Sequence, residues 1–257
     1  MTLPTSPRKA RRPGHRQRRP DIGRSMGNHG VVDAGLTPAL RPSGRNRCAL
    51  NGEEVPRWRG VLHALALLVT LPAVAALLWR HGPGGGLVVY AVGLIGLYAV
   101  SSSYHLAAWS PAGRRRMSRA DHEMIFVFIA ATATPYCLLG VPGEFSDVVL
   151  GSFWLGACLG ALAVVTRFER SRRFISAAYL VLGWLALFTF PEAVQRLDVG
   201  QLLLLGAMGC LYTMGTVVQA KRWPNPSPRL FGYHEVWHAM VVLASACGFV
   251  LIWSFGA

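Results

Sequence analysis

One stretch of the chain organises the interpretation of the rest, and it reads Leu230-Phe231-Gly232-Tyr233-His234-Glu235-Val236-Trp237-His238-Ala239-Met240. It opens an apolar run that continues to Phe255, which is long enough to cross a membrane as a helix. In a helix, His234 and His238 lie four residues apart on one face, close enough to share a metal ion. The same letters match the H-E-x-x-H pattern of zinc peptidases, with Glu235 as the general base. Two amphipathic rings at a membrane interface explain the stretch equally well, so the motif alone leaves both interpretations open.

The composition indicates a membrane protein with several spans. Of the 257 residues, 52% are hydrophobic and only 15% are charged, which is unusual for a soluble domain. The net charge of +14 is unevenly distributed, because 13 of the 26 Lys and Arg residues precede residue 60 and eleven more lie in three short loops. These charges have no aromatic interleaving and no nucleic-acid-binding fold pattern, so we expect no nucleic-acid partner.

The chain divides into two parts by composition. Residues 1–55 are rich in Arg, Pro and Gly and lack apolar periodicity, which predicts a basic, disordered tail. Residues 56–257 are predicted to be an all-α transmembrane domain, because their apolar runs are continuous rather than alternating and each is about 20 residues long. We place seven spans at about 61–79, 87–109, 122–141, 148–166, 174–190, 202–220 and 233–255.

The charges of the loops predict how this domain is oriented. Eleven Lys and Arg residues lie in the loops after the second, fourth and sixth spans, and two lie in the other three loops. The loop after the second span alone contains Arg114, Arg115, Arg116 and Arg119. Because Lys and Arg concentrate on the cytoplasmic side of a membrane, we predict that the N-terminus is inside and the C-terminus outside.

With this orientation, polar residues from three spans lie at one depth near the cytoplasmic face. His105 ends the second span, Asp121 begins the third, and His234 and His238 begin the seventh. Ionisable groups inside a membrane are costly, and they usually mark a site or pair with each other. Three imidazoles and one open position are typical of a catalytic zinc site. We therefore predict one Zn²⁺ bound by the three histidines.

Two further residues are candidates for catalysis. Asp121 is placed to hydrogen-bond a zinc-bound water and accept its proton, with Glu235 as the alternative base. Ser101 lies one turn before the histidine of the second span, where its hydroxyl either stabilises a developing oxyanion or bonds back to a helix carbonyl. His122 points about 100° away from Asp121 on a helix and is interpreted as an interfacial histidine. For His63 we expect a structural polar contact rather than a role as a ligand.

The ordered set of motifs resembles the haemolysin III-related proteins, the bacterial branch of the superfamily that contains the progestin and adiponectin receptors. The resemblance covers about residues 53–255 and is carried by Ser101-x-x-Tyr104-His105, Arg119-Ala120-Asp121-His122, Thr132-Ala133-Thr134-Pro135, Gly183-Trp184 and Tyr233-His234-x-x-x-His238. It implies seven helices, an inside N-terminus and a location in the bacterial plasma membrane. It also implies zinc held by three histidines near the cytoplasmic face, with Asp121 on the zinc water and Ser101 nearby.

The site and the resemblance together favour an intramembrane zinc-dependent hydrolase of lipid amides or esters, similar to the ceramidases of the superfamily. Membrane lipids are the expected partners, and a lipid amide is the expected substrate class. The alternative is a pore-forming, cytolytic or sensor-type membrane protein whose zinc is structural. A metalloprotease using H-E-x-x-H ranks last, because no acidic residue or histidine follows His238 as a third ligand. The sequence leaves the substrate and the oligomeric state open.

Overall fold

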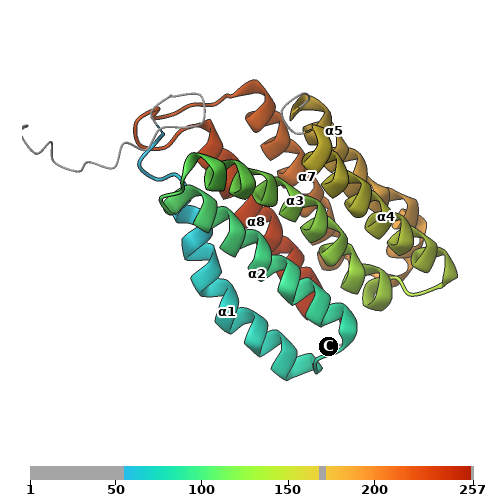
Figure 1. Cartoon of the computed structure of the whole chain (residues 1–257). Helices are drawn as coiled ribbons and strands as arrows, with labels where there is room; N and C mark the ends of the chain where they lie inside the picture. Colours follow the sequence, from blue (N-terminus) through green and yellow to red (C-terminus); the bar gives the residue numbers. More distant parts are fainter. Residues whose placement is uncertain (1–54, 168–171, 256–257) are drawn as a thin grey trace, which may run out of the picture. The chain divides into compact units, whose positions relative to one another are not determined.

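The computed structural model describes residues 55–167 and 172–255, and in these ranges the chain forms helices and no strand. Its α-helices, shown in Figure 1, are α1 (Val61–His81), α2 (Gly85–Leu106), α3 (Pro111–Pro135), α4 (Glu144–Arg167), α5 (Arg172–Gly183), α6 (Phe190–Arg196), α7 (Val199–Lys221) and α8 (Tyr233–Ser254). A π-helical turn, Tyr136–Gly140, extends α3. A 3₁₀ segment, Trp184–Thr189, joins α5 to α6.

Seven helical stretches in the described part of the chain are long and apolar enough to cross a membrane. They follow the order of the predicted spans, so the prediction of an all-α protein with seven transmembrane helices is confirmed. The orientation of the termini stays a prediction. The predicted disordered tail is residues 1–55, and residues 1–54 lie outside the described ranges.

The third span differs most from its prediction, because α3 begins at Pro111 rather than near residue 122. The cluster from Arg114 to Arg119 therefore lies on helical turns and not in a loop. The side chain of Ser110 caps the helix by accepting a hydrogen bond from the Gly113 N–H at 3.1 Å, and Pro111 occupies the first turn. Serine at the cap followed by proline is a standard start signal for a helix. A search by hydropathy alone misses this start because the first turns are strongly charged.

Most successive helices pack side by side, and the last helix also packs against the first. α8 packs against α7 and against α1, while α3 packs between α2 and α4. Small residues allow some of these helices to approach closely, as transmembrane helices commonly do. A Cβ atom added at Gly93 of α2 would collide with Ala131 of α3. The core between the helices is mainly apolar, and Leu77, Tyr90 and Ile252 are among its fully buried side chains.

The start of α1, the end of α2 and the start of α8 meet at one end of the helices (Figure 1). The segment before α1 is joined to the segment before α8, because the Trp58 N–H donates to the Leu230 carbonyl at 3.1 Å. Gly60 then begins α1 with a φ of 82°, and a Cβ atom there would lie 2.5 Å from the Cβ of His105. Glycine suits both the left-handed backbone and the close approach. The beginning of α1 is thereby held against the end of α2.

Candidate metal centre

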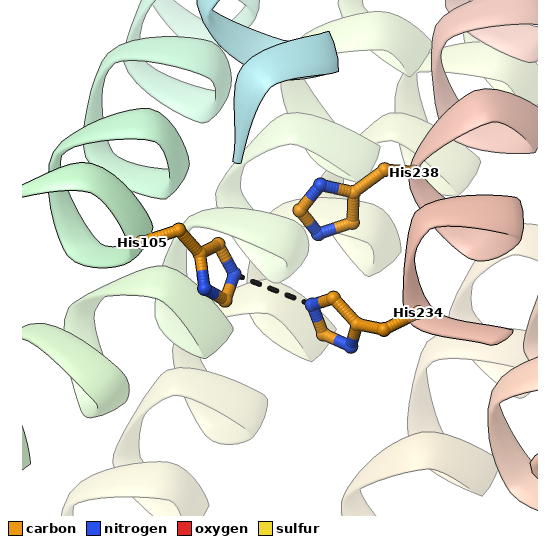
Figure 2. Close-up of side chains that lie close together, drawn as sticks. All are labelled: His105, His234 and His238. Carbon is orange, nitrogen blue, oxygen red and sulfur yellow. Dashed lines mark hydrogen bonds between the residues drawn. The ribbon is translucent and has the colours of Figure 1, made fainter. Parts of the chain in front are cut away.

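Three histidines from two helices meet at this end of the helices, as Figure 2 shows. His105 lies in the last turn of α2, and His234 and His238 lie on one face at the start of α8. One ligand nitrogen from each ring lies within 4.8 Å of those of the other two. The Nε2 atoms of His105 and His234 are 3.3 Å apart. The structure therefore brings together the three histidines that the sequence predicted as ligands.

The spacing and the chemistry of these rings suit zinc. Nitrogen atoms placed tetrahedrally at the usual zinc–nitrogen distance are about 3.3 Å apart, which is the separation between the Nε2 atoms of His105 and His234. Neutral imidazoles are common zinc ligands, and sets of three occur where one coordination position is kept for a reacting group. Within the described residues the group has these three members and no acidic or cysteine ligand.

A fourth histidine, His63 in the first turn of α1, stacks on His238. The ring centroids are 3.9 Å apart and the ring planes differ by 6°, while Tyr98 contacts the His63 ring edge-on. A histidine binds a metal in the plane of its own ring. An ion in the plane of His238 therefore lies well outside the plane of His63, so this ring is placed to hold His238 rather than to share its ion. The structural polar contact expected for His63 is not found, because neither ring nitrogen has a hydrogen-bond partner among the described residues, and the ring stacks on His238 instead.

Asp121 and Ser101 form a polar pair between α3 and α2. The buried hydroxyl of Ser101 is a hydrogen-bond donor to the Asp121 carboxylate. The neighbouring Ser102 instead donates to the carbonyl of Ala99 at 3.2 Å, which is the usual back-bond of a serine in a helix. Because Ser101 lies one turn before His105, the pair connects Asp121 to the helix that carries one of the three histidines.

His122 lies outside the three-histidine group. Its Nδ1 hydrogen-bonds the carbonyl of Ser118 at 2.8 Å, and its own carbonyl accepts from the hydroxyl of Tyr179 at 3.2 Å. The same Nδ1 is 4.0 Å from a carboxylate oxygen of Asp121. These contacts tie the residue to its own helix and to α5.

Glu235, the acidic residue of H-E-x-x-H, has both carboxylate oxygens bonded. One accepts from the guanidinium of Arg59 at 2.5 Å and the other from the N–H of Gly232 at 2.8 Å. The side chain of Glu235 is only 1% exposed. The bond to Gly232 completes a capping box at the start of α8. Sequence reasoning did not single out Arg59, since nothing in its local pattern distinguishes it from the other basic residues that precede the first span.

A cavity of about 310 Å³ lies between α3, α5, α7 and α8, and its walls are predominantly apolar. Along α8 it is lined from Trp237, next to His238, as far as Ile252. The two residues are fifteen positions apart, which corresponds to about 22 Å along the helix. The cavity therefore runs from the neighbourhood of the histidines along most of the length of a span.

The helices and the three converging histidines define a class: a multi-pass, all-helical membrane protein with a candidate metal site at one end of seven spans. The particular family follows from comparison with known proteins. The chain belongs to the family described as Haemolysin-III related, which matches residues 53–249. The matched range contains all three histidines as well as Ser101, Asp121 and Glu235.

Individual relatives agree with this assignment. The chain is 27% identical to Hemolysin-3 of Bacillus cereus over 201 residues, which cover 75% of this chain and 87% of that protein. It is 27% identical to the Hemolysin-3 homolog of Bacillus subtilis (strain 168) over 202 residues, covering 75% and 90%. It is also 26% identical to the human Monocyte to macrophage differentiation factor over 171 residues, covering 65% and 68%. The resemblance inferred from the ordered motifs is confirmed.

Proposed function

We propose that this protein is a zinc-dependent hydrolase of lipid amides or esters whose metal is held by His105, His234 and His238. The observation that carries the proposal is the convergence of three imidazoles with no fourth side-chain ligand in the described part of the chain. Structural zinc sites normally fill all four positions with side chains, whereas catalytic sites leave one for water or substrate.

Zinc bound there would supply an activated water molecule and polarise the carbonyl of the substrate. The chain's own part in the reaction is assigned to Asp121, which Ser101 holds by a hydrogen bond. Its carboxylate accepts the proton of the attacking water and returns it to the leaving amine or alcohol as the carbonyl–nitrogen or carbonyl–oxygen bond breaks. Glu235 is the weaker candidate for this task, because both of its oxygens are already bonded.

The apolar cavity supports a membrane lipid as the substrate. It reaches Trp237 and Val241, on either side of His238 along α8, and continues away from the histidines. None of the three histidines lines the cavity, so the proposal requires the amide or ester carbonyl of a bound acyl chain to extend past the Trp237 end toward the imidazoles. Burial of apolar area is the main source of affinity for such a ligand. We infer that membrane lipids are the partners and that the bacterial plasma membrane is the location.

The test is turnover of fluorescent ceramide and ester analogues by the purified protein, with product separated by chromatography. Wild-type protein is expected to release labelled fatty acid, and His105→Ala is expected to release none above background. His81→Ala is a matched control, because His81 lies at the other end of α1. Absence of turnover by zinc-loaded wild-type protein across amide and ester analogues would overturn the hydrolase proposal.

A second candidate is a pore-forming or sensor-type protein in which zinc is structural. Two observations favour it: two relatives are named Hemolysin-3 or its homolog, and the histidines connect the end of α2 to the start of α8. Zinc in that role would stabilise the fold by joining the two helices. Dye release from vesicles containing the protein, together with zinc-dependent thermal stability and no turnover, is the result expected for this candidate.

A further inference from the structure

Arg114, in the first turn of α3, is a half-buried cation beside the candidate metal centre. Its guanidinium carbon lies 5.9 Å from the centre of the Tyr104 ring, and the centre of that ring is 4.5 Å from the centre of the His105 ring. Among the described residues the guanidinium has no ion pair and no hydrogen bond. Its Nε is enclosed, but the two terminal nitrogens are not. One positive charge is therefore open to a ligand close to a clustered histidine.

The surroundings of Arg114 differ from those of its neighbours. Arg115 and Arg116 are exposed, as basic side chains at a membrane surface usually are. The carboxylate of Glu235 is held by Arg59 and a backbone N–H, so it does not neutralise Arg114. A half-buried charge without a counter-charge is unfavourable at the edge of a membrane, and an anionic ligand removes that cost.

Arg114 shares one face of α3 with Asp121 and Ile125, because the three are spaced by seven and four residues. Ile125 is the first residue of α3 that lines the apolar cavity, whereas Arg114 and Asp121 lie outside it. Along the helix, Arg114 is about 10 Å before Asp121, and Ile125 is about 6 Å after it. The order along this face is therefore the cation, the proposed base and then the chain cavity.

A lipid amide has its parts in a matching order. With the acyl chain in the cavity and the carbonyl at the histidines, the amine part of the molecule extends beyond them toward the start of α3. A carboxylate on this amine part comes within reach of the Arg114 guanidinium, which can donate two parallel hydrogen bonds to it. A ceramide or an acyl ethanolamide presents only hydroxyl groups there and leaves the cation without a counter-charge.

We propose that Arg114 binds a carboxylate on the amine part of the substrate, so that the preferred lipid amides are N-acylated amino acids. The proposal rests on the proposed function, in that an acyl chain occupies the cavity and its carbonyl reaches the histidines. Hydrolysis of such a lipid breaks the carbonyl–nitrogen bond. The carbonyl carbon takes the hydroxyl of water, the nitrogen takes the proton, and a fatty acid and an amino acid are released.

The test compares N-oleoylglycine with N-oleoylethanolamine, which share the chain and the amide but end in a carboxylate or a hydroxymethyl group. Each displaces an uncharged, fluorescent acyl ethanolamide from the purified full-length protein in detergent. Wild-type protein is expected to bind the anionic amide about tenfold more tightly, as for one hydrogen bond between charged groups. Arg114→Gln should bind the two amides equally, and its unchanged affinity for the neutral amide would show that it is folded.

Arg116→Gln provides a matched control, because Arg116 lies in the same part of α3 but is exposed. This variant should keep the wild-type preference. If Arg114→Gln binds neither amide, Arg114→Lys replaces it, and this variant should keep the affinity for the neutral amide with a smaller preference for the anionic one. An undiminished preference in the Arg114 variant that binds would overturn the proposal. Equal binding of the two amides to wild-type protein, binding of neither, or an equal loss of preference in the Arg114 and Arg116 variants would overturn it too.

Hydrolysis of the two amides separates this proposal from the proposed function. Preferential binding of N-oleoylglycine without hydrolysis of either amide would support the carboxylate subsite and contradict the enzymatic function. Hydrolysis of both amides with equal kcat/KM would support the enzymatic function and contradict the subsite. The two failures are therefore distinguishable.

Discussion

Arg59 and Glu235, 176 positions apart in the sequence, form an ion pair in which the Glu235 side chain is buried and the Arg59 side chain is 15% exposed. The Nε of Arg59 donates to one carboxylate oxygen, and the other oxygen caps the start of α8 through Gly232. The pair therefore ties the segment before α1 to the helix that carries two of the three clustered histidines. The acidic residue of H-E-x-x-H has a structural role in this chain, whatever chemistry the histidines perform.

Removing Arg59 should destabilise the protein strongly. Arg59→Met leaves the Glu235 carboxylate buried without its cation, and such changes typically lower the free energy of unfolding by about 3–5 kcal/mol. The double variant Arg59→Met/Glu235→Met removes both charges and should recover much of that loss. Denaturant unfolding in detergent, followed by tryptophan fluorescence, measures the difference. An Arg59→Met protein as stable as wild type would show that the pair contributes little.

Metal content provides the second prediction. Purified wild-type protein should contain about one zinc per chain, and His105→Ala should lose most of it, because two imidazoles rarely retain zinc against cellular chelators. His81→Ala should keep the wild-type content. Elemental analysis of the three proteins decides the matter. Near-full zinc in His105→Ala would place the metal at other residues, such as His63 or His122.

The stack between His63 and His238 gives a prediction that distinguishes two roles for His63, support of the His238 ring and direct binding of zinc. If His63 only holds the ring of His238, then His63→Phe keeps a flat partner and should retain zinc affinity. His63→Ala loses the stack and should weaken zinc binding by roughly tenfold or more, as loss of residues that support metal ligands commonly does. Competition with a coloured chelator measures both affinities. Loss in both variants would make His63 a ligand, and no loss in either would show that the stack is unimportant.

Local pattern was sufficient to predict much of this protein. A transmembrane helix is defined by about 20 consecutive apolar residues, so the seven spans follow from composition along the chain. His234 and His238 share a helix face because their spacing is four. His105 joins them because the second and seventh spans cross the membrane in opposite directions. The end of the second span and the start of the seventh therefore lie at the same face of the membrane. Each of these inferences depends on periodicity or on counting spans, which the sequence contains directly.

Contacts between distant segments were not predictable in the same way. Arg59 meets Glu235, and His63 stacks on His238, through the packing of α1 beside α8, and no local pattern specifies which helices are neighbours. The early start of α3 was missed for a different reason: its Ser110-Pro111 signal precedes charged residues that conceal the helix from a hydropathy search.

The orientation in the membrane is a separate prediction. The N-terminus should be inside and the C-terminus outside, because basic residues are concentrated after the second, fourth and sixth spans. Reporter fusions at Pro142 and at the C-terminus should both report an outside location, and a fusion after Lys221 should report inside. A cytoplasmic C-terminus would place the three histidines at the outer face and remove the argument for their depth.

The choice between Asp121 and Glu235 as the base gives the last prediction. Asp121→Asn should keep zinc and lose hydrolysis by about 10²–10⁴-fold, which is the range expected for removal of a general base. Glu235→Gln should keep much of both, since an amide can still cap α8. Ser101→Ala removes the hydrogen bond that holds Asp121 and should reduce turnover roughly tenfold without loss of metal. Turnover of a fluorescent ceramide analogue and elemental analysis, made on the same preparations, measure the two properties separately.

The outcomes of that experiment discriminate among the mechanisms. If Glu235→Gln loses hydrolysis while Asp121→Asn retains it, the histidines and Glu235 act as in the zinc peptidases, and the ion pair with Arg59 must open during turnover. If both variants hydrolyse as well as wild type, neither carboxylate is the base. Ser102→Ala is the control for Ser101→Ala, because the Ser102 hydroxyl bonds to its own helix, at the carbonyl of Ala99. Equal losses in the two serine variants would mean that the α2 backbone, and not the hydrogen bond to Asp121, explains the effect.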